Sequence, residues 1–393
     1  MEEIQLKDIC DLDNGYAFKS DDYVEKSGTL NCRMSNIRPD GTFDILYSAK
    51  YLPDEFADKY EEYILHDGDL IIAMTDMAGD PKILGVPTVV NTQGYTLLLN
   101  QRVGRLRFIK NGVNADYLKL ALQCPRVRNY LKRFAGGGVQ LNVSKKDILS
   151  APVRMCNEKE QTYVADIFKS VLEIKAKREH KLQLLDDLIK ARFVEMFGDV
   201  KHEEKYKGIP LRELCLTMSG GTPSTKNTEY YEGNIPWITT VSLGPNHIDG
   251  STAKGYITQD AIKNSATKLI PAGNILFGTR VGVGKSSIND VDICTNQDII
   301  AIIGIDENKF NRVFIKHVLD DYQPYYDNLK KGATILGITS DDLKDTLIPD
   351  APIDVQTEFV AFVEQVDKSK VAIQKSLDET QLLFDSLMQK YFG

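Results

Sequence analysis

The sequence contains an internal repeat of about half its length, and this duplication constrains the fold more than any other feature. Leu6-Lys7-Asp8-Ile9-Cys10 followed by Gly15 matches Leu211-Arg212-Glu213-Leu214-Cys215 followed by Gly220, with both markers 205 residues apart. Residues 67–72 match residues 272–277 at the same spacing, and each segment is typical of a turn followed by a buried strand. Two copies of so long a unit indicate a duplicated domain with its helix, not a solenoid of many short repeats.

Later markers keep the same order at a shorter spacing. Asn100-Gln101 matches Asn296-Gln297, and residues 138–144 match residues 333–339. Each copy also closes on a similar tripeptide, Met196-Phe197-Gly198 and Tyr391-Phe392-Gly393, 195 residues apart. The second copy is therefore about 10 residues shorter than the first. Both copies of the repeat keep their turn and strand signals. This favours two functional copies over one functional and one non-functional copy.

A long helix is expected at the end of each copy. Residues 158–197 contain no Gly or Pro and are rich in Leu, Lys, Glu and Ala. Apolar residues recur there in steps of four and three, which is the pattern of a heptad seam in which basic residues occupy some positions. Residues 359–391 show the same pattern. Lys175 and Lys370 fall at equivalent seam positions. The residues predicted to pair the helices are Phe168, Leu182, Leu185, Ile189, Val363, Ile373, Leu377 and Phe384.

These signals predict an α+β fold with two similar mixed α/β domains and two long helices. The predicted parts are residues 1–155, a central helix in 156–204, residues 205–352, and a C-terminal helix in 353–393. We expect the helices to pair as an antiparallel coiled coil with pseudo-twofold symmetry. The alternatives are that each helix packs only on its own domain, or that a partner protein covers part of either stripe. One amphipathic helix is predicted late in each domain, over 115–134 and 310–329.

Net charge alone argues against a nucleic-acid partner. The formal charge is −8 and the pI about 5.3, whereas phosphate binding favours a positive surface. Basic and polar residues nevertheless gather on predicted loops, where Arg and Lys suit phosphates and guanine edges and Asn suits adenine. For any one of them, a solvated surface residue is the competing interpretation. The predicted DNA-binding residues are Arg33, Asn36, Arg38, Lys82, Arg102, Arg105, Lys145, Lys146, Thr222, Lys226, Arg280, Lys285, Lys330 and Lys331.

Catalytic and metal-binding motifs are missing from the sequence. Residues 278–286 resemble a phosphate-binding loop, but the required first glycine is replaced by Thr279, so we interpret the segment as a glycine-rich turn. The five histidines are scattered and no GxSxG motif occurs. We predict a non-catalytic chain that binds no metal or cofactor. The six cysteines form no CxxC pair, which favours a reducing cytoplasmic location, and no apolar run is long enough for a membrane span.

The duplicated order of these segments resembles the specificity subunits of Type I restriction-modification systems. The resemblance rests on residues 6–15 and 138–144 with their repeats at Leu211 and Thr334, and it extends over essentially the whole chain. It implies two target-recognition domains that each read one half of a split sequence in double-stranded DNA, with the helices as a spacer. It also implies two methyltransferase (modification) subunits that use S-adenosylmethionine, and restriction subunits that translocate DNA with ATP and magnesium.

Three other interpretations stay open at this point. One is a non-catalytic coiled-coil scaffold that binds only proteins, and another is the recognition subunit of a related Type II system that cuts on both sides of its site. The third is an enzyme whose motifs are not recognisable. Within the family interpretation, Gly337 replaces Asn142 in the second copy. We therefore expect the two domains to read different sequences.

Overall fold

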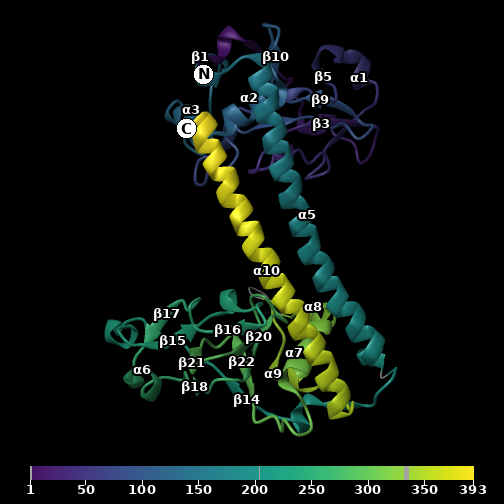
Figure 1. Ribbon diagram of the computed structural model, residues 1–393, viewed down its shortest axis with the longest axis vertical. Coiled ribbons are helices and arrows are strands. Elements are labelled where there is room, and N and C mark those ends of the chain that lie inside the picture. Colours follow the sequence, from purple (N-terminus) through teal and green to yellow (C-terminus); the bar gives the residue numbers. More distant parts are fainter. Residues whose placement is uncertain (1, 203, 332–335) are drawn as a thin grey trace. The chain divides into compact units, whose positions relative to one another are not determined.

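The computed structural model describes residues 2–202, 204–331 and 336–393, which form two compact units. Unit 1 contains residues 1–179 and 375–393, and unit 2 contains residues 180–374. Both divisions fall inside long helices, α5 (Glu158–Phe197) and α10 (Ile353–Phe392), which are the two helices that the sequence predicts (Figure 1). Below, head 1 and head 2 denote the parts of unit 1 and unit 2 that lie outside α5 and α10.

Head 1 is built from small sheets and short helices. Its main antiparallel sheet has the order β2 (Cys10–Asn14), β10 (Val103–Phe108), β6 (Leu70–Ala73), β8 (Pro87–Val89). A second sheet has the order β4 (Tyr51–Leu52), β3 (Thr29–Cys32), β9 (Thr96–Leu99), β5 (Ile64–Leu65), in which β3 and β9 are parallel. Two further pairs are β1 (Glu2–Gln5) with β12 (Pro152–Met155) and β7 (Thr75–Met77) with β11 (Gln140–Asn142). The helices are α1 (Phe56–Lys59), α2 (Ala115–Gln123), α3 (Pro125–Arg133) and α4 (Lys145–Leu149).

Head 2 repeats this arrangement. Its main sheet has the order β14 (Leu216–Ser219), β22 (Ile299–Ile303), β19 (Ile275–Gly278), β20 (Ser286–Asn289), β16 (His247–Ile248). The second sheet has the order β17 (Gly255–Ile257), β15 (Ile235–Ile238), β21 (Ile293–Thr295), β18 (Leu269–Ile270), with β15 and β21 parallel. β13 (Gly208–Pro210) pairs with β23 (Leu347–Pro349). The helices are α6 (Gln259–Lys263), α7 (Arg312–Asp321), α8 (Gln323–Leu329) and α9 (Ser340–Lys344).

The repeated glycine after the first strand of each main sheet has a steric cause. A Cβ atom on Gly15 would lie 2.3 Å from the carbonyl oxygen of Leu99, and one on Gly220 would lie 2.2 Å from that of Asn296. Both distances are far below van der Waals contact, so only glycine lets the two backbones approach this closely. The duplicated glycine therefore marks the same junction between the two sheets of each head.

The prediction of one late helix in each head was wrong, because a proline divides each of them. Cys124 precedes Pro125 and is extended, with φ −60° and ψ 144°, so α2 ends there and α3 begins afterwards. In head 2, α7 ends at Asp321 and α8 carries Pro324 in its first turn. Proline is tolerated in a first turn because its missing N–H would have no helical partner there.

Segments of α5 and α10 contact one another in an antiparallel sense inside each unit. In unit 1, the Phe168 and Phe384 rings are 5.2 Å apart, and Lys175 donates to Gln381 at 2.9 Å. In unit 2, Lys370 pairs with Asp186 at 2.5 Å. Lys175 with Gln381 and Lys370 with Asp186 are equivalent positions of the two repeats, so both units use the same seam position for a polar contact between helices. The remaining predicted seam residues are buried, as for Ile189 and Val363, or half-buried, as for Leu182, Leu185, Ile373 and Leu377.

A buried glutamine fixes the first turn of each long helix to its head. Gln161 accepts a hydrogen bond from the Asn114 backbone N–H and donates to the Cys156 carbonyl, at 2.9 and 2.7 Å. Gln356 accepts from the Asn311 backbone N–H and donates to the Ala351 carbonyl, also at 2.9 and 2.7 Å. Both glutamines are at most 3% exposed, so these bonds satisfy backbone groups that water does not reach.

The repeated Phe-Gly at the end of each long helix has a packing role. Phe392 is 2% exposed in the core of unit 1, 5.2 Å from the Tyr117 ring. Phe197 is 1% exposed in the core of unit 2, 4.7 Å from the Phe314 ring. Gly198 has φ +72°, the left-handed conformation that commonly terminates a helix. Each long helix therefore ends with an aromatic side chain inside the core of a head.

Other sequence predictions concern cysteines, metals and membranes. All six cysteines are free thiols, and burial raises the pKa of the Cys32 thiol to about 12. Within the described residues, no three His, Cys, Asp or Glu side chains gather as metal ligands. None of the described helices has the length and apolar character needed to cross a membrane.

Candidate nucleic-acid interface

The structure places the predicted DNA-binding residues mainly at the surfaces of the two heads. Those that are exposed are Lys82, Arg102, Lys146, Thr222, Lys226, Arg280, Lys285 and Lys331. Those that are half-buried are Arg33, Arg38, Arg105, Lys145 and Lys330, and Asn36 is buried. The prediction that all of them lie on loops was wrong, because Arg105 lies in strand β10 and Lys145 and Lys146 lie in helix α4.

Asn36 serves the fold and does not present its amide to a ligand. It is 3% exposed, and its Nδ2 donates to the backbone carbonyls of Asp44 and Ile45 at 2.9 and 3.1 Å. Its Oδ1 accepts from the backbone N–H of Arg33 at 2.8 Å. The amide is therefore used to hold residues 33–47 in one conformation. An adenine edge would have to displace these buried bonds to reach it.

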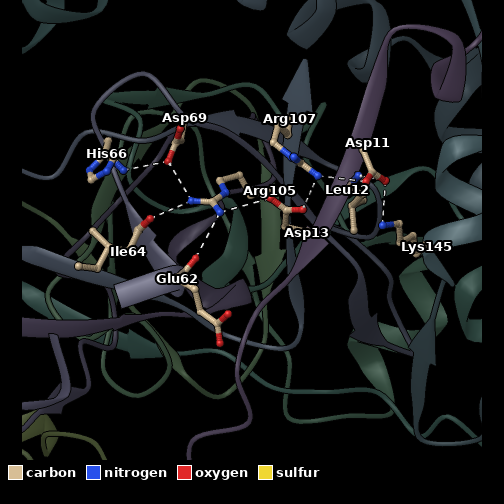
Figure 2. A network of polar contacts seen from close by, with 10 residues as sticks. All are labelled: Asp11, Leu12, Asp13, Glu62, Ile64, His66, Asp69, Arg105, Arg107 and Lys145. Carbon is tan, nitrogen blue, oxygen red and sulfur yellow. Dashed lines mark hydrogen bonds and ion pairs between the residues drawn. The ribbon is translucent and has the colours of Figure 1, made fainter. Parts of the chain in front are cut away.

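Arg105 and Lys145 belong to a charge network across strands β2 and β10, shown in Figure 2. Arg105 donates to the Ile64 carbonyl at 2.9 Å and pairs with Asp13 at 3.3 Å. Arg107 and Lys145 pair with Asp11 at 3.3 and 2.8 Å, and the hydrogen bond from Lys145 is the largest cause of the lowered pKa of Asp11. Arg105 also lies 4.0 Å from Asp69.

This network borders an open cavity of about 530 Å³ that also contains Glu62 and Tyr63. Its cations face carboxylates, so the cavity offers little net positive charge to a phosphate. Sequence reasoning did not identify Asp11 and Asp13 as the partners. The available signal was alternation: Asp at 11 and 13 and Arg at 105 and 107 each recur at every second residue, which places them on one face of their strands.

Head 2 carries apolar residues at the equivalent positions. β2 pairs Asp11 with Arg107 and Asp13 with Arg105, whereas β14 pairs Leu216 with Ile303 and Met218 with Ala301. Met218 and Ile303 pack against an apolar core, and Leu216 is 69% exposed. The two heads thus keep the same strand register but present different chemistry on the same face.

A second exposed region is formed by residues 78–82, which follow strand β7. In head 1, β7 and β11 pair, and the Thr75 hydroxyl donates to the Asn142 side chain at 2.9 Å. Arg128 supports this region by donating to the Lys82 carbonyl at 3.0 Å. Lys82 itself pairs with Asp80 at 3.0 Å, both well exposed. The loop therefore presents residues 78–82 on a hydrogen-bonded base.

The corresponding region of head 2 explains why glycine replaces Asn142. The Ile338 N–H donates to the Thr279 carbonyl at 2.9 Å, and a Cβ on Gly337 would lie 2.7 Å from that same oxygen. A side chain at 337 therefore has no room. Residues 279–285 connect antiparallel strands β19 and β20, which is the turn that the sequence predicts and not a phosphate-binding loop. Residues 332–335, which include the repeat marker at Thr334, lie outside the described residues.

Several of the predicted DNA-binding side chains in these regions already have a polar partner, and others have no ion pair. Arg280 pairs with Asp298 at 3.3 Å, Lys330 pairs with Asp327, and the Thr222 hydroxyl bonds to Gln297 at 2.6 Å. Over residues 2–202, 204–331 and 336–393, the structure shows no ion pair for a further group of exposed cations. This group consists of Arg102, Lys146, Lys226, Lys285 and Lys331.

Arg38 stands in a different setting, at the tip of a tight hairpin. Its guanidinium carbon lies 3.7 Å from the centre of the Tyr47 ring. It borders an open cavity of about 550 Å³ that is also lined by Asp40, Asp44 and Gln93. Sequence reasoning missed Tyr47 and Gln93, because no spacing rule connects residues so far apart in irregular loops.

Comparisons with known proteins give a consistent result. A family model described as "Type I restriction modification DNA specificity domain" matches residues 1–185 and again residues 203–380. The specificity subunit of the Type I restriction enzyme EcoR124I/EcoR124II from Escherichia coli is 29% identical over 177 residues. The MjaIX specificity subunit from Methanocaldococcus jannaschii is 29% identical over 140 residues. These matches cover 42% and 35% of this chain, and only 42% and 32% of the two relatives' own lengths.

Solved structures share the fold over the full chain. The S subunit of a Type I restriction-modification system from M. genitalium superposes with a TM-score of 0.56 at 12% identity, covering 100% of this chain and 96% of that one. A chain from a study of assembly and conformational transition in a type I R-M system superposes with a TM-score of 0.60 at 17% identity, covering 100% and 97%. At such low identities the likeness concerns the fold alone.

Proposed function

This chain belongs to the family of Type I restriction modification DNA specificity domains, and from this we propose that it is the DNA-reading subunit of such a system. We propose that it reads a two-part target in double-stranded DNA, one half with each head. The observation that carries this proposal is the contrast between the heads. The strand pairs β2 with β10 and β14 with β22 keep the same register, yet the same face is charged in head 1 and apolar in head 2. One framework that carries different side chains in its two copies suits two different half-sites.

We assign phosphate contacts first to the exposed cations that have no ion pair. Such groups bind a phosphate without first giving up a protein carboxylate, and each releases about one counterion from the DNA. In head 1 these are Arg102 and Lys146, and in head 2 they are Lys226, Lys285 and Lys331. Lys82, Arg280 and Lys330 would have to exchange an existing partner. These assignments also reconcile DNA binding with a net charge of −8, because they involve only a few local positions on each head.

We assign the long helices to spacing and partner binding. Each runs for 40 residues, about 60 Å at 1.5 Å per residue, without an internal Gly or Pro. Large apolar side chains remain exposed along both helices, among them Leu172, Leu184, Val371 and Leu382, at 46 to 70%. Exposed apolar side chains on a helix suit a protein partner. We propose that two methyltransferase subunits dock there and that restriction/translocase subunits join them.

In this proposal the chain itself is non-catalytic. S-adenosylmethionine, ATP and magnesium would be used by the partner subunits, and the assembly would work in the cytoplasm, where free thiols persist.

The test is to express the chain with its modification subunits and map methylated adenines across a genome that lacks other such systems. We expect one split motif. Replacing residues 205–352 with the head of another family member should change one half of the motif and keep the other half. If no motif appears, or if both halves change together, the assignment of one half-site to each head is wrong.

A further inference from the structure

We propose that Arg38 of head 1 reads a guanine in the major groove, with its guanidinium oriented by Tyr47. This inference rests on the proposed function, because it presupposes that head 1 binds DNA. It goes further by assigning one base to one side chain.

The hairpin that carries Arg38 is ordered by its own backbone. Arg38 donates its N–H to the Thr42 carbonyl at 3.0 Å, and Gly41, with φ +82°, donates to the Arg38 carbonyl at 2.9 Å. Behind the hairpin, the buried Asn36 amide holds the Asp44 carbonyl at 2.9 Å. A loop fixed in this way loses little entropy on binding, which favours a specific contact.

The guanidinium of Arg38 is oriented without being neutralised. It lies 3.7 Å from the Tyr47 ring centre, and across the described residues the structure gives it no carboxylate partner. Stacking on a ring uses the flat face of the guanidinium and leaves its edge N–H groups available. Two edge donors in a plane match O6 and N7 of guanine, which is the commonest specific contact of arginine in the major groove.

The surroundings of Arg38 suit a base pair better than a phosphate. Asp40 and Asp44 line the same cavity of about 550 Å³, and their charges oppose an approaching phosphate. A carboxylate is, however, a suitable acceptor for the cytosine amino group of a G·C pair. Gln93 adds a neutral amide to the cavity, with its backbone at φ +50°. This left-handed conformation is unfavourable for a non-glycine residue, so the surroundings hold the loop in it.

Head 2 has no arginine at the position that corresponds to Arg38. The short helix η3 (Met34–Asn36) of head 1 corresponds to η8 (Thr240–Ser242) of head 2, and both lead into an extended residue, Ile37 or Leu243. Continuing that alignment places Gly244 at the position of Arg38. The inference is therefore confined to one half-site: a guanine recognised by head 1 has no counterpart recognised in the same way by head 2.

The experiment uses the full chain assembled with its modification subunits and a library of duplexes with about 30 randomised base pairs, a length near three DNA turns. Selection is run for the wild type, Arg38→Ala, Arg38→Lys and Tyr47→Ala, with Arg133→Ala as a matched control on an exposed arginine of the same head. We expect Arg38→Ala to relax one guanine by roughly 5- to 150-fold, the range for one bidentate contact, with every other position kept. Arg38→Lys should relax the same position, Tyr47→Ala should relax it less, and the control should keep the motif.

The outcomes separate this inference from the proposed function. If the wild type selects a split motif and folded Arg38→Ala selects the same motif, the guanine assignment is wrong and the proposed function stands. Relaxation at several positions, with far-UV circular dichroism unchanged, would likewise overturn the assignment of one base to one side chain. If the wild type selects no motif at all, the proposed function itself fails.

Discussion

Phe392, at the end of α10, should contribute strongly to the stability of unit 1. Phe392 is 2% exposed and lies 5.2 and 6.0 Å from the rings of Tyr117 and Phe168. Truncating a buried phenylalanine to alanine typically costs about 3–5 kcal/mol, because the transfer energy is lost and a cavity remains. Total stabilities are about 5–15 kcal/mol, so the Phe392→Ala variant should leave unit 1 folded but markedly weakened.

The assay separates the two units by using a probe for each. Hydrogen exchange of the α2 amides reports unit 1, and their protection should fall by about 10²-fold to several thousandfold, since each 1.4 kcal/mol is a factor of ten. Trp237, the single tryptophan, is buried in head 2, and its fluorescence reports unit 2. The midpoint of the urea unfolding transition followed by this fluorescence should shift in the Phe197→Ala variant. It should not change in the Phe392→Ala variant.

A matched control is Phe108→Ala, which removes the same side chain from a position that is 39% exposed in unit 1. Because this side chain is only partly buried, its loss should cost about 1–2 kcal/mol, clearly less than the loss of Phe392. The reasoning is refuted if Phe392→Ala leaves exchange in α2 unchanged. An equal shift of the Trp237 transition in the Phe392→Ala and Phe197→Ala variants would refute the division into separately packed units.

Further predictions concern buried polar groups and surface charge. Gln356→Leu should lower the unfolding free energy measured by Trp237 fluorescence by several kcal/mol, at about 1–3 kcal/mol for each buried backbone group left without a partner. Burial lowers the pKa of His317 to about 4 from an ordinary 6.5, so the unfolded chain takes up this proton first as pH falls. Stability should therefore decline from pH 6.5 toward pH 4, by up to about 3 kcal/mol, and urea titrations of His317→Gln should lack that part of the decline. Lys285→Ala should weaken DNA binding equally for all sequences and reduce the salt dependence by about one counterion, measured as the slope of log affinity against log salt.

The sequence predicts the backbone framework well because a duplication displays the same constraints twice. The glycines at 15 and 220 recur because no Cβ fits there, and the Phe-Gly endings recur because Phe197 and Phe392 are both buried. The long helices follow from a seam that is free of Gly and Pro. The breaks before Pro125 and Pro324 were missed because amphipathic periodicity continues across them, although each proline removes a helical donor.

The candidate interface was harder to predict because exposure and pairing depend on long-range geometry. The Asn36 side chain has an amide that could bind a base edge. In the folded protein, however, this amide is buried inside its own loop. Arg105 is an equally plausible DNA-binding residue from its type alone. In the structure it is bound instead to Asp13 and to the Ile64 carbonyl, which comes from a distant segment. Which polar side chains remain available is decided by such partners, and spacing rules do not report them.

Under the proposed function, the contrast between the two main sheets also indicates where the DNA target can change. Backbone hydrogen bonds set the register of β2 with β10 and of β14 with β22, and these bonds do not depend on side-chain identity. Four positions on one face therefore change from Asp and Arg to Leu, Met, Ala and Ile without a change of fold. Residues such as Gly15 and Gln161 lack this freedom, because their replacement would break a close approach or a buried bond. Changes of DNA target should therefore accumulate on exposed faces and loops, and rarely at these junctions.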